Sequence, residues 1–177
     1  MIHVALLHSI TLPGGRLVMS DLRDMAVALG FKTPRTLMAT GNLVFETDAG
    51  DVHDLERQME AAYAKRFGRS VDIIVRTAPH WRGTVAANPF PDAEAAQVMV
   101  RVQRGTLPPE TIERLAPYRP AYDLIRIVDG DLWVRFGGPP NQSRLLGALT
   151  TKRLGVGTSC IWNTARRLGE MVSSDAT

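Results

Sequence analysis

Residues 122–136, YDLIRIVDGDLWVRF, contain two apolar runs on either side of Asp129-Gly130. An Asp-Gly pair between alternating hydrophobic residues is the strongest short-range signal for a two-residue β-hairpin turn. The stretch therefore predicts two antiparallel strands, at 122–128 and 132–136.

A two-residue turn also predicts the pairing of these strands, with Arg126 opposite Trp133 and Leu124 opposite Arg135. Neighbouring side chains point to opposite faces of a strand. One face should then be apolar and buried: Ile125, Ile127, Leu132, Val134 and Phe136. Arg126, Trp133 and Arg135 should share the other face.

Periodicity places further elements on both sides of the hairpin. Apolar runs and helical spacing predict a strand at 97–103, a short helix from 108, a helix at 142–153, a strand at 156–160 and a last helix from 161. The first half of the chain has the same order. Its strands are expected at 2–8, 35–39, 43–47 and 71–76, and its helices at 19–29, 51–67 and 79–87.

The order in each half is βαββαβ followed by a helix, which is typical of the ferredoxin-like fold. The sequence thus predicts an α+β protein made of two ferredoxin-like halves in tandem, 1–90 and 91–177, each with a trailing helix.

Residues at the helix ends add detail. Ser20 is the expected N-cap of the first helix, and Gly30 its stop; Asp51 should open the second helix. The carboxylates of that second helix are expected mostly on its solvated face: Asp51, Asp54, Glu56 and Glu60.

Composition is that of an ordinary globular protein, with 45% hydrophobic and 22% charged residues. No apolar run reaches the roughly 18 residues of a membrane span, and the amino terminus has no signal-peptide pattern. A lone cysteine, Cys160, fits a reducing compartment. We expect a cytoplasmic protein without a membrane association.

Positive charge is concentrated near the carboxyl end. Between Asp131 and Glu170 there are six basic residues and no acidic one, a local charge of +6: Arg135, Arg144, Lys152, Arg153, Arg166 and Arg167. Such clustering favours a surface that meets anions, phosphates included. The alternative is that these residues are merely solvated.

The face shared by Arg126, Trp133 and Arg135 has two interpretations. An aromatic ring between arginines on an open sheet is suited to stacking single-stranded nucleic acid. Alternatively, the face packs within the protein and Trp133 supplies core area.

Several segments spread along the chain carry a resemblance to a known family: Val4-Ala5-Leu6-Leu7, Gly14-Gly15, Thr36, Gly41-Asn42-Leu43-Val44-Phe45, Val75-Arg76-Thr77-Ala78, Ala86-Ala87-Asn88-Pro89-Phe90 and Trp162-Asn163-Thr164. Together these segments resemble the bacterial domain of unknown function 1697 family. The resemblance implies an α+β fold and no established activity. Two family arginines are missing: His8 stands where the family's first strand has Arg, and Cys160 where its last motif has Arg. An altered or lost family site is therefore expected.

Catalytic chemistry finds little support in the sequence. Cys160 is more consistent with a buried small residue than with a nucleophile, and the four histidines lack metal-ligand spacing. The glycine-rich loops 12–16 and 137–140 match no nucleotide-binding pattern and predict tight connections. No metal and no cofactor is expected, and the catalytic residues and the oligomeric state remain open.

The sequence favours a non-enzymatic binding module that engages an anionic partner, nucleic acid included, through a basic carboxy-terminal surface. The rival is an enzyme that acts on a small anionic metabolite in a cleft between the halves. The candidate ligand-binding residues for the two are Arg126, Trp133, Arg135, Arg144, Lys152, Arg153, Trp162, Asn163, Thr164, Gly14, Gly15, Gly41 and Asn42.

Overall fold

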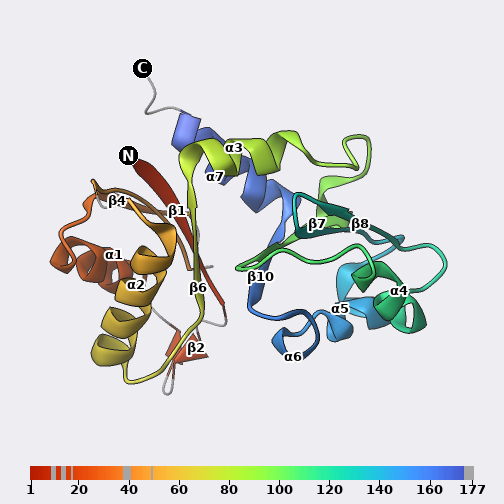
Figure 1. Ribbon diagram of the computed structural model, residues 1–177, viewed down its shortest axis with the longest axis horizontal. Coiled ribbons are helices and arrows are strands. Elements are labelled where there is room, and N and C mark those ends of the chain that lie inside the picture. Colours follow the sequence, from red (N-terminus) through yellow and green to blue (C-terminus); the bar gives the residue numbers. More distant parts are fainter. Residues whose placement is uncertain (9–10, 13–14, 17, 38–40, 49, 174–177) are drawn as a thin grey trace. The chain divides into compact units, whose positions relative to one another are not determined.

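The computed structural model describes residues 1–8, 11–12, 15–16, 18–37, 41–48 and 50–173 (Figure 1). The chain forms two compact units: Met1–Gly83 together with the segment from Arg167 onward, and Thr84–Arg166. The terminal helix α7 (Trp162–Ser173) begins in the second unit and continues in the first. Each unit is described by itself below.

The first unit contains a four-stranded antiparallel sheet. Its strands are β1 (Ile2–Leu7), β4 (Lys32–Leu37), β5 (Asn42–Glu46) and β6 (Ile73–Thr77), in the spatial order β4-β5-β1-β6. This is the ferredoxin-like order, as the sequence predicted. A small ribbon of β2 (Thr11–Leu12) and β3 (Gly15–Arg16), which the sequence did not predict, lies between β1 and the first helix in chain order.

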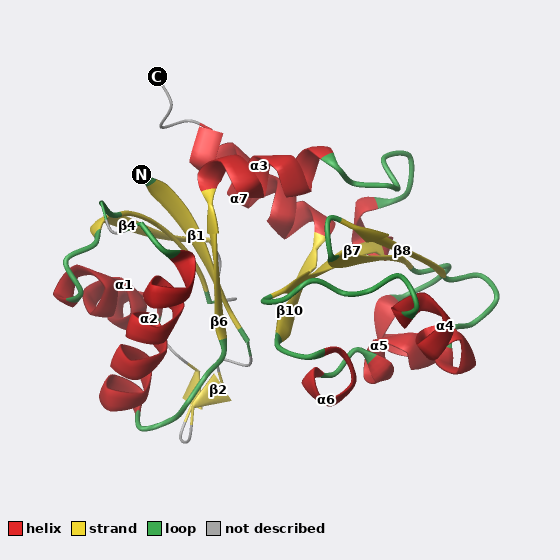
Figure 2. Ribbon diagram, viewed as in Figure 1, coloured by secondary structure: helices red, strands yellow, loops and turns green. Residues whose placement is uncertain are grey.

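Two helices cover one face of this sheet, α1 (Met19–Ala28) and α2 (Val52–Phe67) (Figure 2). Between them and the sheet lies a core that includes Ala5, Leu22, Met25, Leu43, Phe45, Leu55, Met59, Tyr63, Ile73 and Val75. At its centre the rings of Phe31 and Phe45 are stacked, with centroids 4.4 Å apart.

Of the two predicted N-caps, that of α2 is confirmed and that of α1 is wrong. Asp51 is the N-cap of α2, and its carboxylate accepts hydrogen bonds from the backbone N–H groups of His53 and Asp54 at 2.8 and 3.1 Å. The N-cap of α1 is Val18, not Ser20, because the Val18 carbonyl already accepts the first bond of the helix, from Asp21. Ser20 lies inside the helix.

Two carboxylates of α2 are not on a solvated face. Glu56 is 2% exposed, and one of its oxygens accepts a hydrogen bond from Val75 N–H at 2.9 Å. Glu60 accepts one from Ile73 N–H, also at 2.9 Å. Both donors belong to β6, an edge strand whose outer amides need acceptors. The predicted polar face therefore serves, at these two positions, to satisfy the sheet.

The second unit repeats the topology. Strands β7 (Val98–Gln103), β8 (Leu124–Val128), β9 (Asp131–Arg135) and β10 (Gly157–Ile161) are antiparallel in the order β10-β7-β9-β8. Helices α4 (Thr111–Leu115), α5 (Arg144–Ala148) and α6 (Thr151–Leu154) accompany the sheet. Its core includes Met99, Leu115, Ile125, Leu132, Val134, Phe136, Leu145 and Leu154. The trailing helices are α3 (Ala78–Ala86) and α7.

The predicted pairing of the hairpin is confirmed, although its strands span 124–128 and 131–135 instead of 122–128 and 132–136. Arg126 pairs with Trp133, and Leu124 with Arg135. Asp129 and Gly130 both have positive φ, 50° and 84°, as the tight hairpin turn requires.

The single helix expected at 142–153 is instead two short helices, α5 and α6, joined by Leu149 and Thr150. Thr150 is extended, with ψ 155°. Gly147 and the β-branched pair Thr150-Thr151 are weak helix formers, so this stretch of sequence gives the helix little reason to continue. The break turns α6 into a separate element that carries Lys152 and Arg153.

Candidate functional site

The face on the outer side of the hairpin is not an open aromatic platform. Trp133 is 1% exposed, and its ring contacts that of Trp162, with centroids 5.9 Å apart. Arg126 is exposed and donates a hydrogen bond to the Ile125 carbonyl at 2.9 Å. The stacking interpretation of Trp133 is therefore wrong. The alternative, in which Trp133 supplies core area, agrees with its burial.

The remaining predicted residues fall into both units. Gly15, Gly41 and Asn42 belong to the first; Gly41 has φ 78°, and Asn42 is buried in β5. Gly14 lies outside the described residues. In the second unit, Trp162 and Thr164 are half-buried, whereas four of the candidates are exposed: Arg144, Lys152, Arg153 and Asn163.

Three cations of the second unit surround a depression on its surface. A hollow of about 590 Å³ is lined by Arg114, Gly147, Thr150, Lys152 and Arg153. A second hollow, of about 330 Å³, shares Arg114 and Arg153 with the first and adds Leu115, Tyr118 and Leu154. We call these eight residues the basic groove. Among the described residues, Arg114, Lys152 and Arg153 form no ion pair with a carboxylate.

Sequence reasoning found Lys152 and Arg153 but missed Arg114. Arg114 lies on α4, one position after Glu113 and four after Glu110, so it was outside the interval without acidic residues. Only the fold brings α4 and α6 to the same groove.

The groove is built on three successive backbone carbonyls at the end of α6. The Arg153 carbonyl accepts a hydrogen bond from Arg114 Nη2 at 2.8 Å, and the Leu154 carbonyl accepts one from Gln103 Nε2 at 2.7 Å. The Gly155 carbonyl accepts one from Arg101 Nη2 at 3.1 Å. Carbonyls at a helix C-terminus lack intrahelical partners. These side chains supply the partners, and they thereby fix the helix that carries Lys152 and Arg153.

Two of these donors belong to the sheet and are buried. Arg101 and Gln103 lie on β7 and are 1% and 2% exposed. Burial lowers the pKa of Arg101 from its ordinary value. Gly157 makes room for both: a Cβ atom at this position would lie 2.2 Å from Gln103 Oε1 and 3.0 Å from Arg101 Nε. Because Gly157 has no side chain, Arg101 and Gln103 have the space to bond the carbonyls at the end of α6.

Arg153 has a defined orientation within the groove. Its guanidinium carbon lies 4.3 Å from the centroid of the Tyr118 ring, which is cation–π geometry. Because Arg114 also holds the backbone of Arg153, both ends of this residue are positioned. The groove therefore offers a planar cation in a fixed place.

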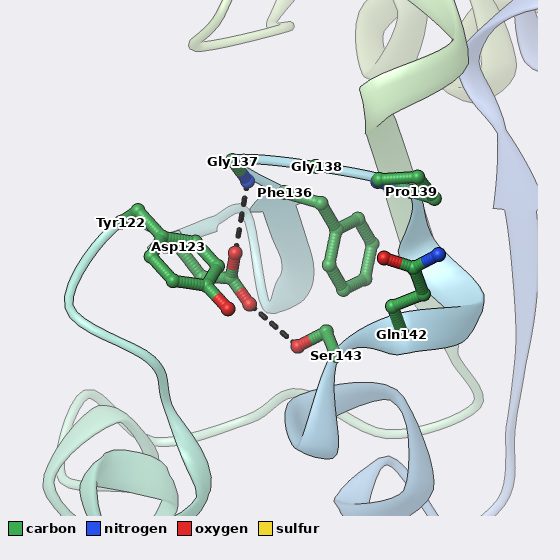
Figure 3. Close-up of a pocket in the computed structure, with 8 residues that line it drawn as sticks. All are labelled: Tyr122, Asp123, Phe136, Gly137, Gly138, Pro139, Gln142 and Ser143. Atoms are coloured by element: carbon green, nitrogen blue, oxygen red, sulfur yellow. Dashed lines mark hydrogen bonds between the residues drawn. The ribbon is translucent and has the colours of Figure 1, made fainter.

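A smaller pocket of about 130 Å³ lies beside the glycine-rich loop 137–140 (Figure 3). Asp123, which is fully buried, faces that loop: its carboxylate accepts hydrogen bonds from Gly137 N–H at 2.9 Å and from Ser143 Oγ at 2.6 Å. Ser143 Oγ in turn accepts one from Leu145 N–H, at the start of α5. An internal carboxylate thus takes the Gly137 amide, which agrees with a structural role for the loop.

Cys160 is not placed for nucleophilic chemistry. The side chain is buried, and burial raises the pKa of its thiol to about 12, so the reactive thiolate is disfavoured at neutral pH. In the part of the chain that the structure describes, no three His, Cys, Asp or Glu side chains gather as a metal would need.

None of the helices described is long and apolar enough to cross a membrane.

Comparisons with known proteins give the fold and the family. A search of curated proteins found no match. The chain is similar in structure to the conserved bacterial protein SP0830 from Streptococcus pneumoniae, with a TM-score of 0.77 and 15% sequence identity over 97% of this chain and 98% of that one. At this identity the likeness shows the fold alone.

The resemblance found in the sequence is confirmed. The family model described as "Protein of unknown function (DUF1697)" matches residues 1–133, which include the whole first sheet and the strands β7, β8 and most of β9. The chain belongs to the DUF1697 family.

Proposed function

We propose that this protein is a non-enzymatic binding module whose basic groove holds a phosphate-bearing anion. One observation carries the proposal: Arg114, Lys152 and Arg153 line a single depression, and among the described residues none of the three forms an ion pair with a carboxylate. Clustered positive charge of this kind raises the local concentration of anions and accelerates their association.

The chemistry of the lining supports binding over catalysis. The groove presents guanidinium and ammonium groups, the Thr150 hydroxyl and the Tyr118 phenol. All of these donate hydrogen bonds, and none is a carboxylate, imidazole or thiol of the kind that enzymes most often use as a general base. Two candidate residues of the first unit have structural roles: Gly41 has positive φ, and Asn42 is buried in β5.

The first test measures binding of a fluorescein-labelled single-stranded oligonucleotide by fluorescence anisotropy. Contact of three cations with phosphates predicts that log affinity falls with a slope of about 2 against log salt concentration, since single strands give about 0.7 per contact. Oligonucleotide serves here as a regular array of phosphates.

A matched pair of variants locates the site. Lys152→Glu and Lys65→Glu make the same change of net charge, and both side chains are exposed, but Lys65 lies on α2 of the first unit. We expect Lys152→Glu to weaken binding about 10-fold and Lys65→Glu to weaken it less than 2-fold. Equal effects of the two variants, or no binding at low salt, would contradict the proposal.

A further inference from the structure

The basic groove has two chemically different ends. At one end, Thr150 and Lys152 offer a hydroxyl and an ammonium group beside Gly147, which has no side chain to fill the space. At the other end, Leu115 and Leu154 form an apolar wall next to Tyr118. Arg114 and Arg153 belong to both hollows. A ligand that fills the whole groove needs an anionic part and a flat apolar part.

The anionic end has a donor that the fold leaves unused. Thr150 is the N-cap residue of α6, a position at which a threonine hydroxyl commonly bonds the helix backbone, yet its side chain makes no capping hydrogen bond. Thr150 and Lys152 are both exposed, so hydroxyl and ammonium are accessible from solvent. A hydroxyl and a cation in the wall of one hollow are well suited to phosphate oxygens.

The other end is suited to an aromatic ring. The Arg153 guanidinium lies over one face of Tyr118, at 4.3 Å from the ring centroid, and the residue is exposed. Guanidinium planes stack on nucleobases, and a plane already positioned loses less freedom on doing so. The two hollows, about 590 and 330 Å³, lie in the range of roughly 300–1,000 Å³ common to small-ligand sites.

We propose that the basic groove recognises a nucleotide. Its phosphate lies against Thr150 and Lys152, and its base stacks on Arg153 beside Tyr118. This inference rests on the proposed function and adds the base to it. The nucleotide is either free or the 5′-terminal residue of a nucleic acid strand, two sources with the same chemistry.

The experiment uses the full chain and isothermal titration calorimetry with AMP, adenosine, inorganic phosphate, and a six-residue oligonucleotide with or without a 5′-phosphate. We expect AMP to bind at least 10-fold more tightly than either adenosine or phosphate. If the 5′-phosphorylated oligonucleotide binds more tightly than AMP, the site recognises strand ends. If it binds as tightly as AMP or less tightly, the site recognises free nucleotides.

Variants separate the two ends of the groove. Arg153→Lys keeps the charge but removes the plane, and Tyr118→Leu removes the ring beneath it. Each should weaken AMP binding about 10-fold and leave phosphate binding within 2-fold of the parent. Tyr122→Leu is the matched control, because Tyr122 is an exposed tyrosine outside the groove. Tryptophan fluorescence confirms that each variant is folded.

The outcomes distinguish this inference from the function beneath it. If AMP binds no more tightly than inorganic phosphate, or if Arg153→Lys has no effect on AMP, the nucleotide inference is overturned while the anion groove stands. If neither AMP, phosphate nor oligonucleotide binds, both are overturned.

Discussion

Replacing Gly157 with alanine should destabilise the second unit, because the new methyl group would enter space that the donors of α6 occupy. The added Cβ would lie 2.2 Å from Gln103 Oε1, far inside contact distance. Gln103 is 2% exposed and bonds the Leu154 carbonyl at 2.7 Å, so its side chain cannot swing into solvent without leaving that carbonyl unpaired.

The magnitude follows from three contributions. Overpacking a filled interior costs about 1–3 kcal/mol. A buried hydrogen bond lost with its acceptor left unsatisfied costs about 1–3 kcal/mol. The alanine restricts the unfolded chain, which offsets about 0.4–1 kcal/mol. The expected loss in the free energy of unfolding is therefore about 3 kcal/mol.

Urea unfolding followed by tryptophan fluorescence measures this loss, since Trp133 and Trp162 both lie in the second unit. Gly147→Ala is the control: Gly147 lies on α5, and a Cβ there meets no atom within 4 Å. We expect that control to be unchanged or up to about 1 kcal/mol more stable, because alanine favours helices. A Gly157→Ala protein as stable as the parent would refute the account of how α6 is held.

Three further outcomes are expected. Glu56→Ala should lower the free energy of urea unfolding by about 1–3 kcal/mol, because Val75 N–H loses its buried acceptor; an unchanged midpoint would count against that role. Burial lowers the pKa of His3 below 6.5, so as the pH falls through about 6.5 the unfolded chain binds a proton that the folded chain does not, and stability declines. His3→Phe should flatten that decline in urea titrations between about pH 7.5 and 5.5, and an equally steep decline in the variant would assign it to other groups. The Cys160 thiol, whose pKa burial raises to about 12, should react with a chromogenic disulfide reagent far more slowly in the native protein than in urea; equal rates would mean that the thiol is accessible.

Local signals in the sequence carried most of the fold. The Asp129-Gly130 turn specified the register of its hairpin, and the side-chain alternation around it identified the buried face. Asp51 and Gly68 mark the ends of α2 as capping rules require, with Gly68 at φ 69°. These features depend on residues that are close in sequence, so one amino-acid sequence is enough to predict them.

The candidate site depended on contacts that local patterns do not contain. The segment from Val98 to Gln103 is apolar except at Arg101 and Gln103, and this pattern does not reveal that these two residues are the buried donors for carbonyls more than 50 residues away. The sequence also left open whether the side chain of Trp133 is exposed or packed in the interior. Its face is covered in part by Trp162, which comes from a different element. Charge counting found the basic segment, but Arg114 joined it only through the packing of α4 near α6.

The two carboxylates that α2 directs to β6 have a consequence for association between molecules. A strand at the end of a sheet offers its outward amides to any extended peptide that arrives, and this is a common beginning of aggregation. Here Glu56 and Glu60 already occupy the amides of Val75 and Ile73. A strand from another molecule would have to displace both carboxylates of α2 before it could pair with β6. The helix therefore protects this edge of the sheet against aggregation.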